Sequence, residues 1–124
     1  MATIGDLVDL LERAGFTVAP PGDNTTALPC VVLSPVALDP QAGNRLLWHV
    51  IDILPAVSAT PWKEQHEVLV EYTVQVVKAL SATNTQFQFL DRFPFETDTD
   101  RPTPVQQYRI NVRFAGPDLC PPTP

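Results

Sequence analysis

Basic residues are scarce in this sequence. Of its 124 residues two are lysine and six are arginine, against 14 aspartates and glutamates, so the formal net charge is −6. Proteins that hold nucleic acids through their phosphates need clustered lysine and arginine. The few basic residues here are scattered along the chain, which argues against a protein that grips nucleic acid.

Cysteines and long apolar segments are also scarce. The two cysteines are Cys30, in an expected strand, and Cys120, in a proline-rich tail, so we expect two free thiols rather than a disulfide framework. No apolar stretch approaches the roughly 20 residues that span a bilayer. The N-terminal segment carries acidic residues where a secretory signal has a basic start. We therefore expect no membrane span and a cytosol-like compartment.

Complete catalytic and metal-binding motifs are missing as well. His66 and Glu67 copy the first half of a zinc-protease signature, but Val70 stands where the second histidine is needed. His49 and Asp52 are three residues apart in an expected strand, which places them on opposite faces, so each is interpreted as a satisfied polar group rather than a catalyst.

One acidic segment resembles the start of a calcium loop. It carries Glu96, Asp98 and Asp100 at alternate positions, but Arg101 stands where such a loop needs glycine. The default interpretation is a solvated acidic loop, with an adventitious divalent site as the alternative. From these missing motifs we expect no enzyme, no cofactor and no built metal site.

What is present begins with a helix and two strands. Thr3 and Asp6 form a variant of a capping box, the apolar residues that follow have helical spacing, and Gly15 ends the helix. Residues 30–38 and 44–55 are rich in β-branched and aromatic residues and predict two strands joined by a hairpin turn. The second strand is apolar on both sides, which is typical of a central strand or of one that meets another subunit.

A long helix is predicted from Thr60 to Ala82. Thr60 would be its N-cap and Pro61 its first residue, where proline is well tolerated. The helical period indicates one buried stripe, which we expect to consist of Trp62, Leu69, Thr73, Val76 and Leu80.

The C-terminal third predicts two more strands. Four phenylalanines of one parity, Phe87, Phe89, Phe93 and Phe95, indicate core, with a bend or bulge near Asp91 and Arg92. Residues 105–114 then read as a strand whose even positions are mainly apolar. Its odd positions form a polar row of Gln107, Arg109, Asn111 and Arg113.

The order of elements predicts the fold class. Helix, two strands, long helix and two strands favour an α+β domain over residues 1–115, a mostly antiparallel sheet of about four to five strands with two helices packed on one face. Residues 116–124 are expected to form a Pro-rich C-terminal tail that does not continue the sheet.

In layout the chain resembles the tail terminator proteins of long flexible-tailed, siphovirus-type bacteriophages. The segments that carry the resemblance are "TIGDLVDLLERAG", the hairpin "CVVLSPVAL…RLLWHVIDILP", the helix from Pro61, and the final "YRINVRF". The resemblance implies a structural virion protein that forms a hexameric ring on the end of the tail tube, terminates tube polymerisation and provides the joint to the head connector. It also implies assembly in the host cytoplasm, a place at the head–tail junction, and DNA passing through the ring without specific binding.

The polar row and one tryptophan are the candidate interface residues. We interpret Gln107, Arg109, Asn111 and Arg113 as a subunit-contact face, where arginine can pair with carboxylates of a neighbour. The alternative is a plain exposed sheet face. Trp48 is a further interface candidate, against a place in the intramolecular core.

Three other functions stay open at this point. A head-side neck or head-tail completion protein of the phage would have a similar size. A non-viral small binding module would use the two-sided strand to hold a small molecule or peptide, without a ring. An enzyme ranks third, because its catalytic residues cannot be assembled from this sequence.

Overall fold

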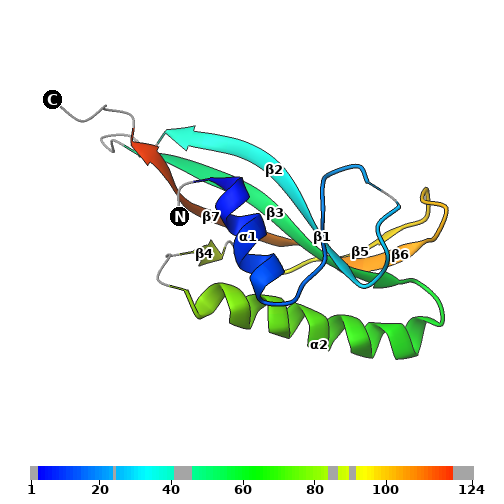
Figure 1. The fold of residues 1–124 in the computed structure, drawn as a ribbon. Helices are drawn as coiled ribbons and strands as arrows, with labels where there is room; N and C mark the ends of the chain where they lie inside the picture. Colours follow the sequence, from blue (N-terminus) through cyan, green and yellow to red (C-terminus); the bar gives the residue numbers. More distant parts are fainter. Residues whose placement is uncertain (1–2, 24, 41–45, 84–86, 90–91, 119–124) are drawn as a thin grey trace, which may run out of the picture.

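The computed structural model describes residues 3–23, 25–40, 46–83, 87–89 and 92–118 and forms an α+β domain (Figure 1). The predicted fold class is confirmed, but the sheet has seven strands rather than four or five. The elements are α1 (Ile4–Arg13), β1 (Val18–Ala19), β2 (Cys30–Pro40), β3 (Leu46–Ser58), α2 (Trp62–Ser81), β4 (Gln88–Phe89), β5 (Phe95–Asp98), β6 (Val105–Tyr108) and β7 (Ile110–Asp118). Four of the seven strands, β1, β4, β5 and β6, have only two to four residues each, which is too short for a periodic pattern to predict them.

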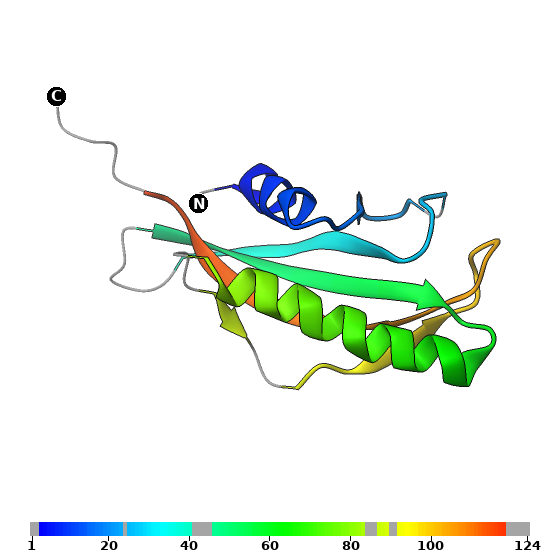
Figure 2. The ribbon, with the colours of Figure 1, turned by 60° about the horizontal axis from the view of Figure 1, so that its bottom comes forward.

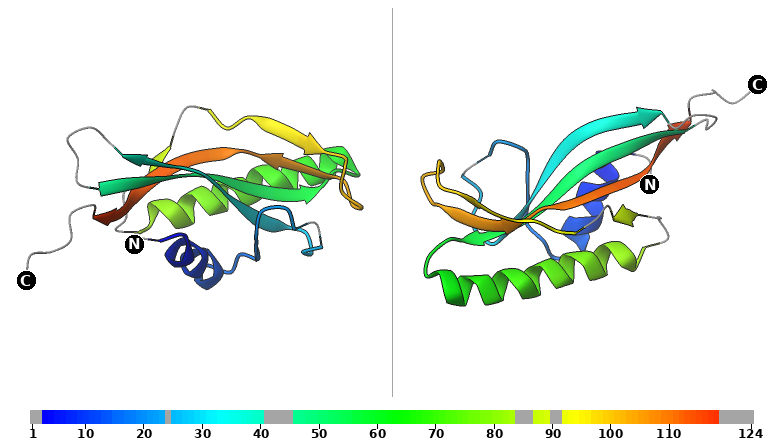
Figure 3. Two further views of the ribbon diagram at one scale, coloured as in Figure 1. Left: turned by 90° about the horizontal axis from the view of Figure 1, so that it is seen from above. Right: turned by 180° about the vertical axis from the view of Figure 1, so that it is seen from behind.

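The 13-residue strand β3 lies at the centre of the sheet. The strand order is β1-β2-β3-β6-β5, and β7 pairs with both β3 and β4. All pairs are antiparallel except β1 with β2. Figure 3 shows β2 along one side of β3, with β6 and β7 following one another along the other side.

Both helices pack on one face of this sheet. Figure 2 shows α2 lying lengthwise along the sheet. The core between sheet and helices is formed by buried side chains from α1, α2 and three strands: Leu7, Leu11, Val31, Leu33, Ile51, Ile53, Val76, Leu80, Ile110, Val112 and Phe114. Neither helix is long and apolar enough to cross a membrane.

The local signals for α1 are confirmed. The Thr3 hydroxyl accepts a hydrogen bond from the Asp6 N–H at 3.2 Å, and the Asp6 carboxylate accepts one from the Thr3 N–H at 3.1 Å. Leu7 and Leu11 are fully buried. Gly15 follows with φ of 96°, a conformation that favours glycine, and ends the helix.

The predicted start of α2 is wrong. The helix begins at Trp62 with Pro61 as N-cap, and no side chain caps it. The Ser58 hydroxyl binds the backbone of Thr60, donating to its C=O at 3.0 Å and accepting from its N–H at 3.4 Å, so Thr60 belongs to the preceding turn. The first member of the expected stripe, Trp62, is 59% exposed, whereas the other four are buried: Leu69, Thr73, Val76 and Leu80.

The two-sided burial of β3 is confirmed from residue 51 to residue 57. Ile51 and Ile53 face the helices, while Leu54 and Ala56 belong to a second, smaller cluster on the other face. That cluster includes Cys30, which is a free, fully buried cysteine; Cys120 lies outside the described residues.

The predicted last strand is interrupted at Arg109. The Arg109 N–H donates to the Pro94 carbonyl at 2.9 Å, so this residue leaves the ladder with β3. The register is nevertheless continuous, because Ala56 pairs with Gln107 and Ile53 pairs with Ile110. In this register Arg109 lies opposite Leu54, and its neighbour Tyr108 lies opposite Pro55, which has no N–H to donate. The alternation of apolar and polar faces therefore survives the interruption.

Two further expectations about the C-terminal third are wrong. Phe87, Phe89 and Phe93 pack against the core, but Phe95 is 46% exposed. Its strand is separate from β4, and the bend predicted near Asp91 falls partly outside the described residues. Strand β7 continues to Asp118, beyond the expected end of the sheet at residue 115, with a register shift between Leu46 and Trp48. An irregular ladder of this kind tolerates proline.

Candidate interaction surface

All five predicted interface residues lie on the sheet face opposite the helices. We call this the open face and define it by Trp48, Gln107, Arg109, Asn111 and Arg113 with the carboxylates that bind them, Asp39, Asp52 and Glu96. Seen from above, the sheet lies in front of α2 and neither helix crosses this face (Figure 3, left). The residue types that the sequence singled out are therefore brought together by strand alternation.

A buried carboxylate holds the centre of the open face. Asp52 on β3 is 6% exposed and lies directly across the ladder from Asn111 on β7. Its carboxylate accepts a hydrogen bond from the Asn111 side-chain amide at 2.8 Å and a charged one from Arg109 Nη1. The prediction that Asp52 is a satisfied polar group is confirmed.

The row continues from Arg109 to strand β5. Arg109 Nε donates to Glu96 Oε2 at 3.0 Å, and Gln107 Nε2 donates to Glu96 Oε1 at 3.3 Å. The hydrogen bond with Glu96, helped by the charge of Asp52, raises the pKa of the Arg109 guanidinium above its ordinary value. Arg109 therefore bridges two carboxylates from two different strands.

A second group surrounds Arg113 at the other end of the row. Arg113 Nε donates to the Gln88 side-chain oxygen at 2.5 Å, and Nη1 lies 3.7 Å from the Asp39 carboxylate. Its guanidinium carbon is 5.6 Å from the centre of the Trp48 ring, a cation–π distance. The Trp48 indole nitrogen is buried and has no hydrogen-bond partner among the described residues.

The partners of the arginines are the part that sequence reasoning missed. Arginine forks were expected to pair with carboxylates of a neighbouring subunit, whereas Asp52, Glu96 and Asp39 belong to the same chain. Asp52 lies 57 positions from Arg109, and only the strand register brings them together. The one available signal was an acidic residue in an apolar strand, because such a residue needs a partner.

Gln106 is another buried polar residue that the sequence did not reveal. It is 1% exposed, and its side-chain amide donates to the Ser58 carbonyl at 3.1 Å and to the Trp62 carbonyl at 3.3 Å. Its oxygen lies 3.3 Å from His66 Nδ1, and the Tyr108 hydroxyl lies 3.4 Å from His66 Nε2. The half zinc motif at His66 thus sits in a network that fastens the start of α2 to β6.

A polar cleft of about 340 Å³ lies between the loop after β1 and the loop after β5. Asp23, Asp98, Asp100 and Arg101 line it. Hydrogen bonds from the Thr25 backbone and from the Thr25 and Thr26 hydroxyls lower the pKa of Asp23 to about 2. Glu96, which accepts hydrogen bonds from Arg109 and Gln107, does not line this cleft. Within the described ranges no three carboxylate, imidazole or thiol groups are placed to hold a metal ion.

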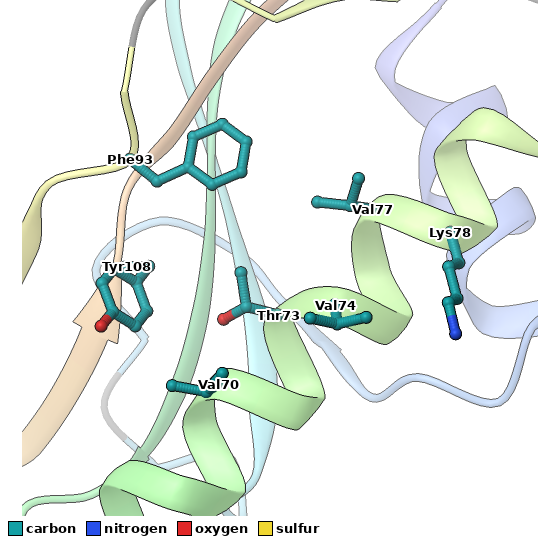
Figure 4. A pocket seen from close by; sticks show the side chains of 7 residues that line it. All are labelled: Val70, Thr73, Val74, Val77, Lys78, Phe93 and Tyr108. Atoms are coloured by element: carbon teal, nitrogen blue, oxygen red, sulfur yellow. The ribbon is translucent and has the colours of Figure 1, made fainter.

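An apolar groove of about 460 Å³ runs beside α2 (Figure 4). We call it the α2 groove; it is lined by Val70, Thr73, Val74, Val77, Lys78, Phe93 and Tyr108. Thr73 is 8% exposed, and its hydroxyl has no hydrogen-bond partner among the described residues. The groove can therefore accept an apolar segment that brings one polar group.

The open face offers cations and amides fixed in position, and the α2 groove offers exposed valines beside one unsatisfied hydroxyl. No family model matches the chain, and a comparison with curated proteins found no match.

Proposed function

We propose that this protein is a structural virion protein that forms a hexameric ring on the end of a phage tail tube. There it terminates tube polymerisation and provides the joint to the head connector. The proposal rests on the resemblance in layout to tail terminator proteins, with two helices on one face of a mostly antiparallel sheet. The partners are then other copies of the chain, the tail tube protein and the head–tail connector.

The open face is the observation that carries this proposal. Its charged groups are held by partners from their own chain before any neighbour arrives, as the bonds of Arg109 to Asp52 and Glu96 illustrate. Groups that are already ordered lose little conformational freedom when a partner binds. Arginine and tryptophan are also among the residues that interfaces favour, which suits Arg113 stacked on Trp48.

The charge of the molecule suits a ring through which DNA passes. Each chain carries a formal net charge of −6. An acidic ring repels a phosphate backbone rather than trapping it. In this proposal DNA crosses the lumen without specific binding, and the protein is assembled in the host cytoplasm and ends at the head–tail junction of the virion.

Sedimentation velocity over a wide concentration range, with and without magnesium, tests the ring. We expect a species of six chains for the wild type. Arg113→Glu places a carboxylate beside Asp39 on the open face and should shift the protein to monomer. Lys63→Glu is the matched control, because it makes the same charge change at an exposed residue of α2 and should keep the ring.

Tail tubes provide the second arm of this experiment. If the wild type is monomeric in the absence of tail tubes, it should still bind tube ends and stop their growth, because the tube end then serves as the template for ring assembly. A chain that forms no ring and leaves tube growth unchanged contradicts the proposal. Binding to the connector in place of the tube identifies a head-side neck protein instead.

A small binding module is the second candidate, and the α2 groove favours it. The groove has room for an apolar ligand or peptide side chains and holds an unsatisfied hydroxyl at Thr73. A saturable ligand together with a chain that is monomeric under all conditions supports this function over the ring.

A further inference from the structure

Large apolar side chains are exposed in two separate regions of the described chain. One region is the outer half of β2, residues 35–40, where Val36 is 54% and Leu38 is 55% exposed. The other follows α2 and the start of β5 and consists of Trp62, Val68, Val70, Val74 and Phe95. Patches of this kind on a small domain mark contact surfaces.

The outer half of β2 is an open sheet edge. Strand β1 pairs with β2 only at Val31 and Val32, so among the described residues no strand pairs with the free side of β2 beyond Leu33. A register shift between Pro35 and Ala37 marks a bulge at Val36. Such an edge carries outward-facing backbone N–H and C=O groups as well as its apolar side chains.

The α2 groove is complementary to this edge in chemistry. Val70, Val74 and Val77 form one wall, and Phe93 and Tyr108 form the other (Figure 4). The buried Thr73 hydroxyl lacks a partner, which costs free energy unless an incoming group satisfies it. A backbone carbonyl or N–H of an unpaired strand edge supplies that group, together with apolar side chains for the walls.

The groove and the edge cannot meet within one chain. Tyr108 belongs to β6 and Phe93 precedes β5, whereas β2 lies on the other side of the central strand β3 (Figure 1). We propose that the outer half of β2 of one subunit docks into the α2 groove of the next subunit. The contact joins two different surfaces, so it is head-to-tail, and a head-to-tail contact closes into a ring when its rotation allows.

This inference rests on the proposed function and names the subunit contact of the ring. The apolar docking supplies most of the affinity, because it removes exposed valine and leucine surface from water. The open face then fixes orientation and selects partners, which is what ordered charges do at interfaces.

Cysteine crosslinking tests the docking directly. Leu38→Cys and Val74→Cys are made separately in a Cys120→Ser background, and Cys30 is kept because it is fully buried. After mild oxidation we expect disulfide-linked dimers only when the two variants are mixed, and a ladder up to six chains when one chain carries both changes. Val68→Cys is the matched control for Val74→Cys, since Val68 is 45% and Val74 40% exposed but only Val74 lines the groove.

The outcomes separate the docking from the proposed function. Crosslinking of Leu38→Cys to itself indicates a two-fold contact and overturns the docking, as does equal crosslinking to Val68→Cys. If the wild type forms the ring or caps tail tubes but the mixed Leu38→Cys and Val74→Cys variants give no crosslink, the docking is overturned and the proposed function stays in place. A wild type that neither self-associates nor binds tubes, and gives no crosslink, overturns both.

Sedimentation of an arginine variant gives an independent readout. Leu38→Arg should shift the ring to monomer, whereas Val68→Arg should keep it, with circular dichroism checking that each variant is folded. A ring that persists in folded Leu38→Arg overturns the docking. If Leu38→Arg does not fold, the crosslinking result alone decides.

Discussion

At the scale of single residues, the charged row is part of the fold as well as a surface. Asp52 is buried in the central strand, and the Arg109 guanidinium and the Asn111 amide hold its carboxylate. Replacing Arg109 with glutamate would leave that carboxylate without its cation and place another acid beside it. A chain in which both Arg109 and Arg113 are changed to glutamate should therefore fail to fold as a monomer, so Arg113→Glu alone is the cleaner probe of assembly.

Arg109→Leu should lower the free energy of unfolding by about 2 kcal/mol. Removing one partner of a fully buried ion pair costs more, but the Arg109 side chain is 38% exposed, so water replaces part of what is lost. Urea denaturation measures the change. Asp52→Asn in the same chain should recover part of the loss, because a neutral amide at this buried position needs no cation.

Arg113→Leu is the control for this experiment. Its carboxylate partner, Asp39, has a side chain that is 42% exposed, so the loss should stay below about 1 kcal/mol. Equal losses for the two arginines would show that burial of Asp52 is not what makes Arg109 important.

At the scale of elements, local patterns predicted what depends on local sequence. The capping box of α1, the stripe from Leu69 to Leu80 and the two-sided strand β3 follow from residues within one or two turns, or from strand alternation. The face of the polar row was also predictable, since alternation survives the interruption at Arg109.

What the sequence missed depends on register between distant segments. No local sequence pattern predicts that Asp52 pairs with Arg109, or that Gln106 is buried under the start of α2. The exposure of Phe95 likewise depends on where β5 lies at the sheet edge. The short strands β1 and β4 exist only because longer strands accept them as neighbours.

The two helix starts give a prediction at this scale. Thr3→Ala removes the hydroxyl that accepts from the Asp6 N–H and should lower the free energy of unfolding by about 1 kcal/mol. Thr60→Ala is the matched control, because no side chain caps α2 and Thr60 lies in the preceding turn. Thermal unfolding followed by circular dichroism compares them, and a larger loss for Thr60→Ala would restore Thr60 as a cap.

At the scale of the whole molecule, the two proposed contact surfaces should respond to salt in opposite directions. In the proposed ring, six chains that each carry a formal net charge of −6 would repel one another. Salt screens this repulsion over a Debye length that falls from about 10 Å at 0.1 M to about 3 Å at 1 M. An apolar contact is not weakened by that screening, whereas ion pairs between arginines and carboxylates of neighbouring subunits are.

If the docking of the outer half of β2 into the α2 groove supplies most of the affinity, the association of the subunits should strengthen as sodium chloride rises from about 0.1 M to about 1 M. Sedimentation velocity at a fixed protein concentration measures the fraction of chains in the ring at each step. Leu38→Arg should remain monomeric throughout the series, which excludes a nonspecific effect of salt. A ring that dissociates as salt rises would assign the affinity to the charged row of the open face, because only an interface dominated by ion pairs loses more from screening than the repelling chains gain.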